Sequence, residues 1–512
     1  MLSKLYSATV FGVDAYIVEV EVDVRPGLPL FNIVGLPDTA VQESRERVRS
    51  AIKNSEFEFP MQRITVNLAP ADIKKEGPVF DLPIAIGILA ASGQVKSDLL
   101  DKHIIIGELS LDGSIRPVNG VLPIALMANK LGKKKLLVPQ ANAMEAGIIK
   151  QLEVFPTISL YEVVEFLNKK ITIEPVLVNT KDIFNKKNDN QIDFSEVKGQ
   201  EHAKRALEVA AAGSHNVIMI GPPGSGKTML ARRLPSILPS LTLEESIEIT
   251  KLYSIANLLP ADTPLITERP FRAPHHTISN SGLIGGGKIP KPGEISLSHN
   301  GVLFLDELPE FSRSALESLR QPLEDGIVTI SRSLSSVTYT ASFMLVASLN
   351  PCPCGFFGDP VKTCTCSSSQ IIKYRSKISG PLLDRIDIHI EVPRIDCREI
   401  MEKEVVENST AIRKRVERTR RIQRERFGKD NIFCNAQMSK KQIEKYCQIN
   451  QNCKNLLYKA IDKLNLSTRA YDRILKVART IADLEQSKNI KISHLSEAIQ
   501  YRSLDRKLWL YQ

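Results

Sequence analysis

Residues 217–233 read VIMIGPPGSGKTMLARR, and this stretch decides the fold of the second half of the chain. A short apolar strand runs into a glycine-rich loop, and a helix follows the loop directly. The glycines let backbone N–H groups converge on phosphate oxygens, and the start of the helix adds the positive end of its dipole. We therefore expect nucleotide binding by eight consecutive residues: Gly221, Pro222, Pro223, Gly224, Ser225, Gly226, Lys227 and Thr228.

Polar side chains at the ends of two later strands complete the expected site. Lys227 of such a loop reaches the β- and γ-phosphates, and the Thr228 hydroxyl is a ligand for Mg²⁺. In GVLFLDE an apolar strand ends in two carboxylates, Asp306 to hold Mg²⁺ through water and Glu307 to polarise the attacking water. The strand SFMLVASLN ends at Asn350, which suits the positioning of water near the γ-phosphate. The plainer alternative for the acidic pair is a buried strand followed by a helix-capping acid. The plainer alternative for Asn350 is a turn residue.

Alternating strands and helices predict an α/β protein with more than one domain. Residues 1–168 mix alternating strands with apolar helices, and the polar stretch NTKDIFNKKNDNQ predicts a linker over 169–193. In 194–397, short apolar strands are separated by helices, which predicts a parallel sheet covered on both faces. Residues 398–512 have a helical pattern throughout.

The bulk composition narrows the class of protein. The 512 residues carry a net charge of +10, which fits a polyanionic partner such as nucleic acid but equally a solvated basic surface. There is no run of about 18 apolar residues to predict a membrane span, and the N-terminus lacks an apolar secretory region. Eight cysteines in a chain of this length do not form a secreted disulfide framework. We therefore expect a cytoplasmic protein.

The order of the motifs resembles the magnesium-chelatase-related branch of AAA+ ATPases, and within it the ComM/YifB group. The likeness is carried by FRAPHHTISNSGLIGGGKIPKPGEISLSHNGVLFLDELPEF, LRQPLEDG, NPCPCG, SGPLLDRID and LNLSTRAYDRILKVARTIADLE, and it extends over the whole chain. The resemblance implies a P-loop parallel-sheet core with a C-terminal helical lid, ATP and Mg²⁺ as cofactors, and a homo-oligomeric ring, by analogy a hexamer.

The resemblance also implies roles for two arginines. Arg385 of SGPLLDRID corresponds to the arginine finger, which reaches the γ-phosphate held by a neighbouring subunit. Arg469 of LSTRA corresponds to the sensor-2 arginine of the lid, with Arg473, one turn later, as the alternative. A surface salt bridge is the ordinary role of an arginine on a helix.

Three segments are candidates for contact with DNA. By resemblance, the irregular stretch 267–300 is a helix-2 insertion that faces a ring's pore, and 327–340 is a second pore hairpin. The run 411–429 has nine basic and two acidic residues, and arginine clusters bind phosphates well. The candidate contacts are Lys288, Lys291, Arg332, Arg420, Arg421 and Arg424, with His275 and His276 as a pair that either meets phosphates or packs the loop. The alternative for the run is a solvated linker helix.

Four cysteines form the pattern C-x-C-x9-C-x-C directly after Asn350: Cys352, Cys354, Cys364 and Cys366. Four soft ligands so close together favour Zn²⁺ in a tetrahedral structural site. The C-x-C spacing is tighter than the usual C-x2-4-C, so an unmetallated reduced loop is the alternative.

Residues 1–168 resemble the Lon protease domain, which has a ribosomal-S5-like α+β fold. Val79 occupies the place of the protease's serine nucleophile, and Leu122 occupies that of its catalytic lysine. A Ser–Lys dyad requires both groups, so we expect a non-proteolytic domain.

Taken together, the residues predict an ATPase, and the resemblance implies a ring-forming DNA motor that drives branch migration of recombination intermediates, as in natural transformation. Two alternatives remain. A protein-remodelling chaperone would favour an aromatic pore loop, and residues 276–294 contain no Phe, Tyr or Trp. A magnesium-chelatase-like subunit would insert metal into a tetrapyrrole, and the fused Lon-like domain argues against that role.

Overall fold

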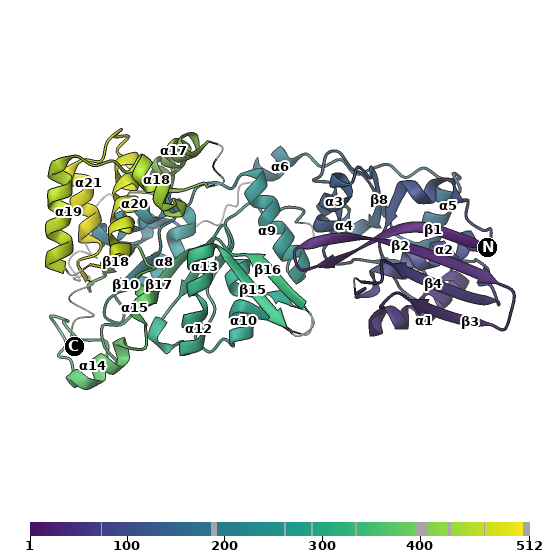
Figure 1. Cartoon of the computed structure of the whole chain (residues 1–512), viewed down its shortest axis with the longest axis horizontal. Coiled ribbons are helices and arrows are strands. Elements are labelled where there is room, and N and C mark those ends of the chain that lie inside the picture. The colour runs from purple at the N-terminus through teal and green to yellow at the C-terminus, as the bar shows by residue number, and fades with distance from the viewer. Residues whose placement is uncertain are drawn as a thin grey trace. The chain divides into compact units, whose positions relative to one another are not determined.

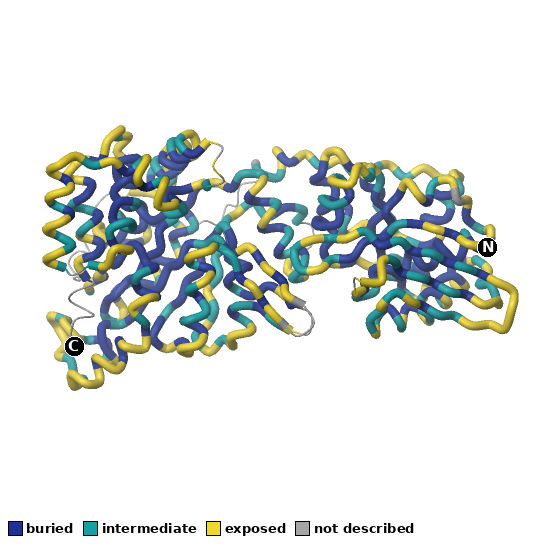
Figure 2. The backbone as a smooth tube through the Cα atoms, in the orientation of Figure 1, coloured by how far each residue is buried: buried dark blue, intermediate teal, exposed yellow. Residues whose placement is uncertain are grey.

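The computed structural model describes residues 1–512 apart from 73, 186–191, 261–262, 288–289, 333–334, 395–406, 429, 431, 465 and 505–512. The chain forms two compact units (Figure 1). The first comprises Met1–Lys187 and Leu243–Thr267, and the second comprises Asn188–Thr242 and Glu268–Gln512. Each unit buries its own apolar core (Figure 2).

A seven-stranded mixed sheet organises the first unit, with the strand order β3-β4-β2-β1-β5-β8-β9. Its strands are β1 (Leu2–Phe11), β2 (Asp14–Arg25), β3 (Leu30–Val34), β4 (Arg63–Ala69), β5 (His103–Ile105), β8 (Lys135–Pro139) and β9 (Glu153–Thr157). The valines of β2 at positions 18, 20, 22 and 24 are all buried, as their alternation with acidic residues predicts.

Helices bury the apolar face of this sheet. They are α1 (Thr39–Asn54), α2 (Asp81–Ala91), α3 (Val121–Lys130), α4 (Gln140–Ala146) and α5 (Leu160–Leu167). The apolar run LPIAIGILAAS lies almost entirely in α2, which is buried on nearly every side. An apolar residue at almost every position suits a helix that lies inside a core.

The first compact unit is larger than the expected domain 1–168. The Val176 N–H donates to the carbonyl of Val154 on β9 at 2.8 Å, and part of the expected linker forms the helix α6 (Thr180–Asn185). The helix α9 (Leu243–Ala256) also belongs to this unit. Its Ser254 Oγ donates to the buried carboxylate of Glu145 at 2.5 Å.

A five-stranded parallel sheet organises the second unit, with the order β11-β14-β17-β10-β18. Its strands are β11 (Phe271–Arg272), β14 (Val302–Leu305), β17 (Met344–Leu349), β10 (Val217–Ile220) and β18 (Ile388–Glu391). The three central strands are fully buried, as their short apolar runs predict. Because the strands are parallel, their carboxyl ends meet at one edge, where ligands bind in open α/β sheets.

Helices and two small hairpins complete the second unit. The helices around the sheet are α7 (Glu201–Gly213), α8 (Lys227–Arg233), α10 (Asn280–Ile284), α11 (Glu294–Leu297), α12 (Arg313–Ser318), α13 (Arg320–Asp325), α14 (Ser368–Arg375) and α15 (Gly380–Leu383). The hairpins are β12 (Gly285–Gly286) with β13 (Lys291–Pro292), and β15 (Ile327–Arg332) with β16 (Ser335–Thr340). The second is the hairpin expected over 327–340.

The C-terminal part is helical, as expected (Figure 1). Its helices are α17 (Ser409–Phe427), α18 (Lys440–Tyr446), α19 (Gln451–Leu464), α20 (Thr468–Leu484) and α21 (Ile492–Gln500). Buried polar contacts join them to the sheet: Arg473 on α20 forms an ion pair with the buried Asp387 just before β18. Burial alone would raise the pKa of Asp387, but the Arg473 cation and the adjacent His215 side chain hold that pKa below its usual range. Among the described residues, none of the helices is both long and apolar enough to cross a bilayer.

Candidate nucleotide-binding site

The glycines of the phosphate loop are required by its backbone geometry. Gly224 and Gly226 have φ of +76° and +91°, a region that L side chains rarely adopt. A Cβ at Gly221 would lie only 2.1 Å from the carbonyl oxygen of Val392. The loop therefore folds as its sequence predicts, between β10 and α8.

Lys227 lies at the centre of the site. Its Nζ donates to the carbonyls of Gly221 at 2.7 Å and Pro222 at 2.8 Å, and to Asn350 Oδ1 at 3.3 Å. Burial lowers the pKa of Lys227 to about 8, and the charges of Asp306 and Glu307 oppose this effect. The contact with Asn350 shows that the phosphate loop and the end of β17 meet, as the sequence predicts.

Thr228 and Asp306 also meet across this edge of the sheet. Thr228 Oγ1 donates to Asp306 Oδ2 at 2.7 Å. A hydroxyl and a carboxylate are hard oxygen donors, so the pair fits the ligand preference of Mg²⁺. The buried Ser348 of β17 donates to Asp306 Oδ1 and thereby fixes the carboxylate. Sequence reasoning missed Ser348, since a serine inside an apolar strand shows its direction only once the strands are paired.

Glu307 is exposed beside these groups, at a residue with φ of +53°. Its carboxylate lies 3.8 Å from the Nδ1 atom of His276. The His276 ring lies against that of His275 at a tilt of 34°, with 4.1 Å between centroids, and makes an edge contact with Phe311. The structure thus brings one histidine of the pair to the predicted catalytic carboxylate, a contact that the sequence did not indicate.

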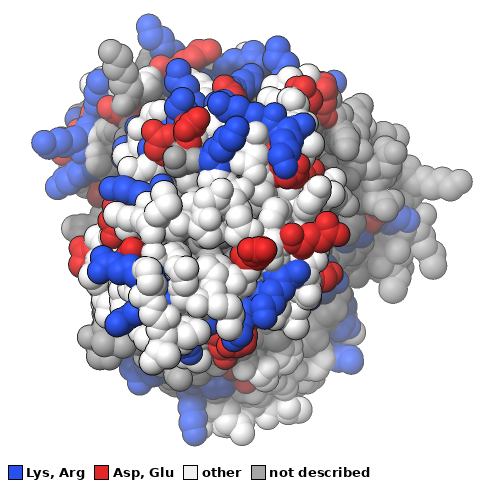
Figure 3. Space-filling model, turned by 90° about the vertical axis from the view of Figure 1, so that its right-hand side faces the viewer, with Lys and Arg blue, Asp and Glu red and all other residues white. Residues whose placement is uncertain are grey.

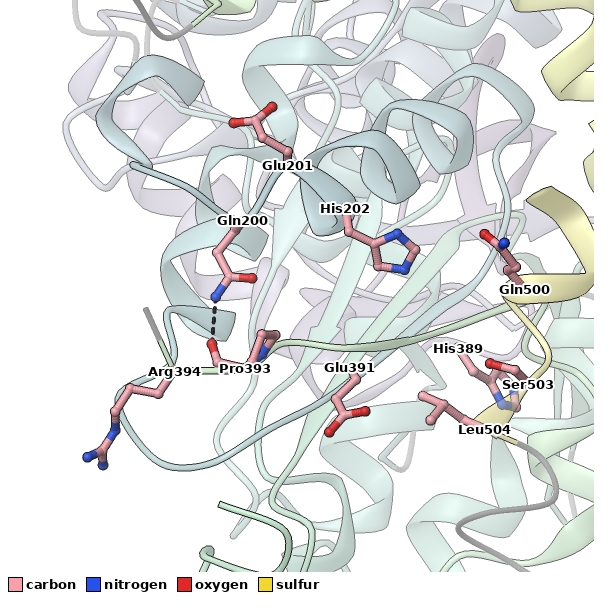
Figure 4. A pocket seen from close by; sticks show the side chains of 10 residues that line it. All are labelled: Gln200, Glu201, His202, His389, Glu391, Pro393, Arg394, Gln500, Ser503 and Leu504. Atoms are coloured by element: carbon pink, nitrogen blue, oxygen red, sulfur yellow. Dashed lines mark hydrogen bonds between the residues drawn. The ribbon is translucent and has the colours of Figure 1, made fainter. Parts of the chain in front are cut away.

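The second unit contains a pocket of about 620 Å³ (Figure 4). It is lined by Gln200, Glu201, His202, His389, Glu391, Pro393, Arg394, Gln500, Ser503 and Leu504. Gln200 Nε2 donates to the carbonyls of Pro393 at 2.6 Å and of Ser225 in the phosphate loop at 3.4 Å. The pocket joins α7, β18 and the last helix, so its residues are distant in the sequence and none was predicted.

The two arginines implied by the resemblance lie together. Arg385 is largely buried and forms an ion pair with Glu324 on α13. Arg469 is more than half exposed and lies 3.9 Å from the same carboxylate. Arg473, the alternative to Arg469, is held instead by its ion pair with Asp387.

Comparisons with known proteins agree with this geometry. A model of magnesium chelatase, subunit ChlI, matches residues 193–400, a model of the C-terminal part of that subunit matches 406–502, and a further ChlI model matches 20–142. Competence protein ComM of Haemophilus influenzae is 46% identical over 99% of this chain and 98% of its own length. YifB of Escherichia coli is 44% identical over the same shares. The chain belongs to the ComM/YifB family.

This family lies within the magnesium-chelatase-like AAA+ ATPases, which accounts for the P-loop core and the helical C-terminus. Lon protease 2 of Bacillus subtilis is also similar, at 34% identity over 26% of this chain and 25% of that protein. In this ComM/YifB-family chain, Val79 and Leu122 are both buried and neither side chain has a nucleophilic atom. The Leu122 N–H donates to Glu145 at 2.9 Å, so this position is part of the packed core.

The four cysteine sulfurs of this ComM/YifB-family chain all lie within 4.8 Å of one another. The Cys352–Cys354, Cys352–Cys364 and Cys354–Cys364 pairs are 3.3, 3.7 and 3.6 Å apart. Zn–S bonds of about 2.3 Å in a tetrahedron place the sulfurs about 3.8 Å apart. The cluster therefore has the donor set and the spacing of a Cys₄ metal site.

The predicted DNA contacts differ in their settings. Lys291 is exposed in the β12–β13 hairpin. Arg332 lies at the end of β15, while its side chain and all of Lys288 fall outside the described residues. Arg420 requires a correction: it is buried on α17 and donates to the carbonyl of Ala211 on α7 at 3.2 Å. Its guanidinium stabilises helix packing and is not presented at the surface.

Other cations of α17 remain exposed. Arg421 and Arg424 are exposed, and so are Lys414 and Arg418. Lys414, Arg418 and Arg421 follow one another at spacings of four and three residues, which places them on one helical face. By contrast, Arg415 and Arg426 form ion pairs with acidic residues of the fold. We call Lys414, Arg418, Arg421 and Arg424 the α17 basic face.

Proposed function

We propose that this protein is an ATP-hydrolysing ring motor that acts on DNA in the cytoplasm and drives branch migration of recombination intermediates, as in natural transformation. The observation that carries the ATPase step is the meeting of three strand ends at one sheet edge. There the phosphate loop contacts both Asp306 and Asn350. The relative named competence protein ComM supports the DNA step.

Each residue of the site has a role in this proposal. The phosphate loop binds the triphosphate, Lys227 neutralises the β- and γ-phosphates, and Thr228 with Asp306 holds Mg²⁺. The metal supplies charge neutralisation at the phosphates when bound. Glu307 polarises the attacking water and Asn350 positions it. The pocket beside Gln200 takes the base and ribose, because Gln200 in its wall donates a hydrogen bond to Ser225 of the phosphate loop.

The ring completes the site. Arg385 and Arg469 contact Glu324 on α13 and not the phosphate loop of their own chain. We assign both to the nucleotide of a neighbouring subunit, where their charge stabilises the transition state. A hexamer is the assembly that the family resemblance implies.

DNA binding is electrostatic in this proposal. The exposed α17 basic face and Lys291 contact phosphates, together with Lys288 and Arg332 of the two hairpins. Guanidinium groups suit this task because they present several donors to phosphate oxygens. On the face of the molecule in Figure 3, the basic and acidic side chains of the described residues are intermixed around an uncharged area.

A bound Zn²⁺ is the last part of the proposal. The donor type and spacing of the Cys₄ cluster support this assignment. Its role here is structural, because four cysteines leave no open coordination position for chemistry.

The decisive experiment measures ATP hydrolysis with and without single-stranded, duplex and four-way-junction DNA. Lys227→Ala is expected to abolish nucleotide binding, while Glu307→Gln is expected to bind ATP and stop turnover. Stimulation by DNA supports the motor, with the largest effect expected from the junction. An ATPase that neither binds nor responds to DNA at low salt would instead indicate a protein-remodelling enzyme.

A further inference from the structure

The four cysteines lie in a segment that adjoins the nucleotide site at two places, the end of β17 and the phosphate loop. We call residues 351–367 the cysteine knuckle. It begins one residue after Asn350, whose side chain accepts a hydrogen bond from Lys227. The buried Arg375 of α14 donates from Nε and Nη2 to the carbonyl of Pro351, at 3.1 and 3.0 Å, and so fixes the start of the knuckle.

The knuckle also packs against the phosphate loop itself. A Cβ at Gly355 would lie 2.5 Å from Cδ and 2.6 Å from Cγ of Pro223. The backbone of Gly355 is therefore in direct contact with the Pro223 ring. The Gly355 N–H donates to the carbonyl of Cys352 at 2.9 Å, so this contact is made by the turn that carries Cys352 and Cys354.

The turn has little apolar packing of its own to hold it there. The chain between the two cysteine pairs contains no helix or strand. Its apolar side chains Phe357 and Val361 are exposed, and Phe356 is only partly buried. Such segments open locally at low free-energy cost unless something ties them down. A metal bound by the four sulfurs would stabilise the folded turn, because the free energy of metal binding adds to the free energy of folding.

We infer that the cysteine knuckle is a metal-dependent buttress of the nucleotide site: a divalent, thiolate-preferring metal, Zn²⁺ by its chemistry, holds Pro223 and Asn350 in place for ATP. This inference rests on the proposed nucleotide site. It goes further by making ATP affinity depend on occupancy of a metal site that does not touch the nucleotide.

The test compares metal content with nucleotide affinity. The variant Cys364→Ser/Cys366→Ser removes the two ligands that are farther along the chain from both Asn350 and the Gly355 turn. Its control is Thr363→Ser/Thr365→Ser, which changes exposed neighbours and keeps every sulfur. Metal is measured by elemental analysis, and affinity is measured by titration with a fluorescent ATP analogue.

Wild type and control are expected to carry about one zinc per chain, the stoichiometry of one Cys₄ site. The double cysteine variant is expected to carry none and to bind the analogue at least tenfold more weakly. Gly355→Ala keeps all four ligands, so it should retain the metal and still lose affinity. If the cysteine variant fails to fold, wild-type protein is stripped of metal with a chelator instead. Its affinity for the analogue is expected to fall and to recover when Zn²⁺ is added back.

Three results overturn the inference. They are a wild type without metal, a metal-free protein that binds the analogue as tightly as wild type, and stripped wild type whose weakened binding does not recover with Zn²⁺. Failure of the proposed function has a different signature, because wild type loaded with zinc would then bind no ATP analogue at all.

Discussion

The lowered pKa of Lys227 predicts that ATP binding weakens at moderately alkaline pH. The amine is buried between loop carbonyls and Asn350, and its pKa is about 8. Bound phosphates favour the charged amine, so they raise this pKa in the complex. The affinity contributed by the cation is therefore complete below pH 8 and is lost as the pH rises through that value.

The size of the effect follows from the titration of one group. With a pKa of about 8, Lys227 is about 90% charged at pH 7 and about 10% charged at pH 9. The dissociation constant for ATP should then increase about tenfold between these pH values, equivalent to about 1.4 kcal/mol. Binding at pH 9 should also take up about 0.9 proton per ATP, against about 0.1 at pH 7.

The assay is a calorimetric titration with a non-hydrolysable ATP analogue and Mg²⁺, repeated in buffers of different ionisation enthalpy. Lys227→Arg is the control, because a guanidinium stays charged over this range and its affinity should be flat. A wild type whose affinity is constant from pH 7 to pH 9 without proton uptake would refute the reasoning. A wild type and Lys227→Arg that decline together would assign the effect to another group.

Three further predictions concern the ring interface, the magnesium ligands and the α17 basic face. Arg385→Ala subunits should bind ATP without hydrolysing it, and mixing them with Lys227→Ala subunits should restore part of the activity; no recovery at any ratio would indicate a site completed within one chain. Ser348→Ala should raise the Mg²⁺ concentration needed for half-maximal ATPase, because Asp306 loses the hydroxyl that fixes it; an unchanged Mg²⁺ dependence would leave Ser348 as a packing residue. Arg421→Gln/Arg424→Gln should weaken binding to all DNA sequences alike and flatten the log–log salt slope by about 0.9 for each lost phosphate contact on duplex DNA; the charge-matched control Lys440→Gln/Lys441→Gln, on exposed residues of α18, should leave binding unchanged, and equal losses in both variants would point to net charge alone.

The sequence predicts best where neighbours in the chain also act together. The phosphate loop, Asp306 and Glu307, and the four cysteines each lie in short segments with a spacing that chemistry dictates, and the structure brings them to one edge of the sheet. The parallel order of β10, β14 and β17 explains why separate motifs converge.

Features that depend on packing between distant elements could not be predicted. Arg420 and Arg421 are adjacent in one basic run, yet α7 covers the first and leaves the second exposed. Ser348 looks like an ordinary strand residue until β17 is placed beside β14. The pocket beside Gln200 combines residues from both ends of the second unit, so no local pattern marks it.

The placement of α9 has a practical consequence for dissecting the molecule. The chain passes between its compact units at 187–188, again at 242–243 and again at 267–268. A fragment that starts at the expected ATPase boundary near residue 194 would still contain α9. It would lack the core against which Ile247 packs and the Glu145 carboxylate that accepts the hydrogen bond from Ser254. Such a fragment would expose apolar surface of α9 to solvent. Poor solubility of a truncated ATPase would then result from the separation of α9 from the first unit. It would not indicate whether the first unit takes part in catalysis.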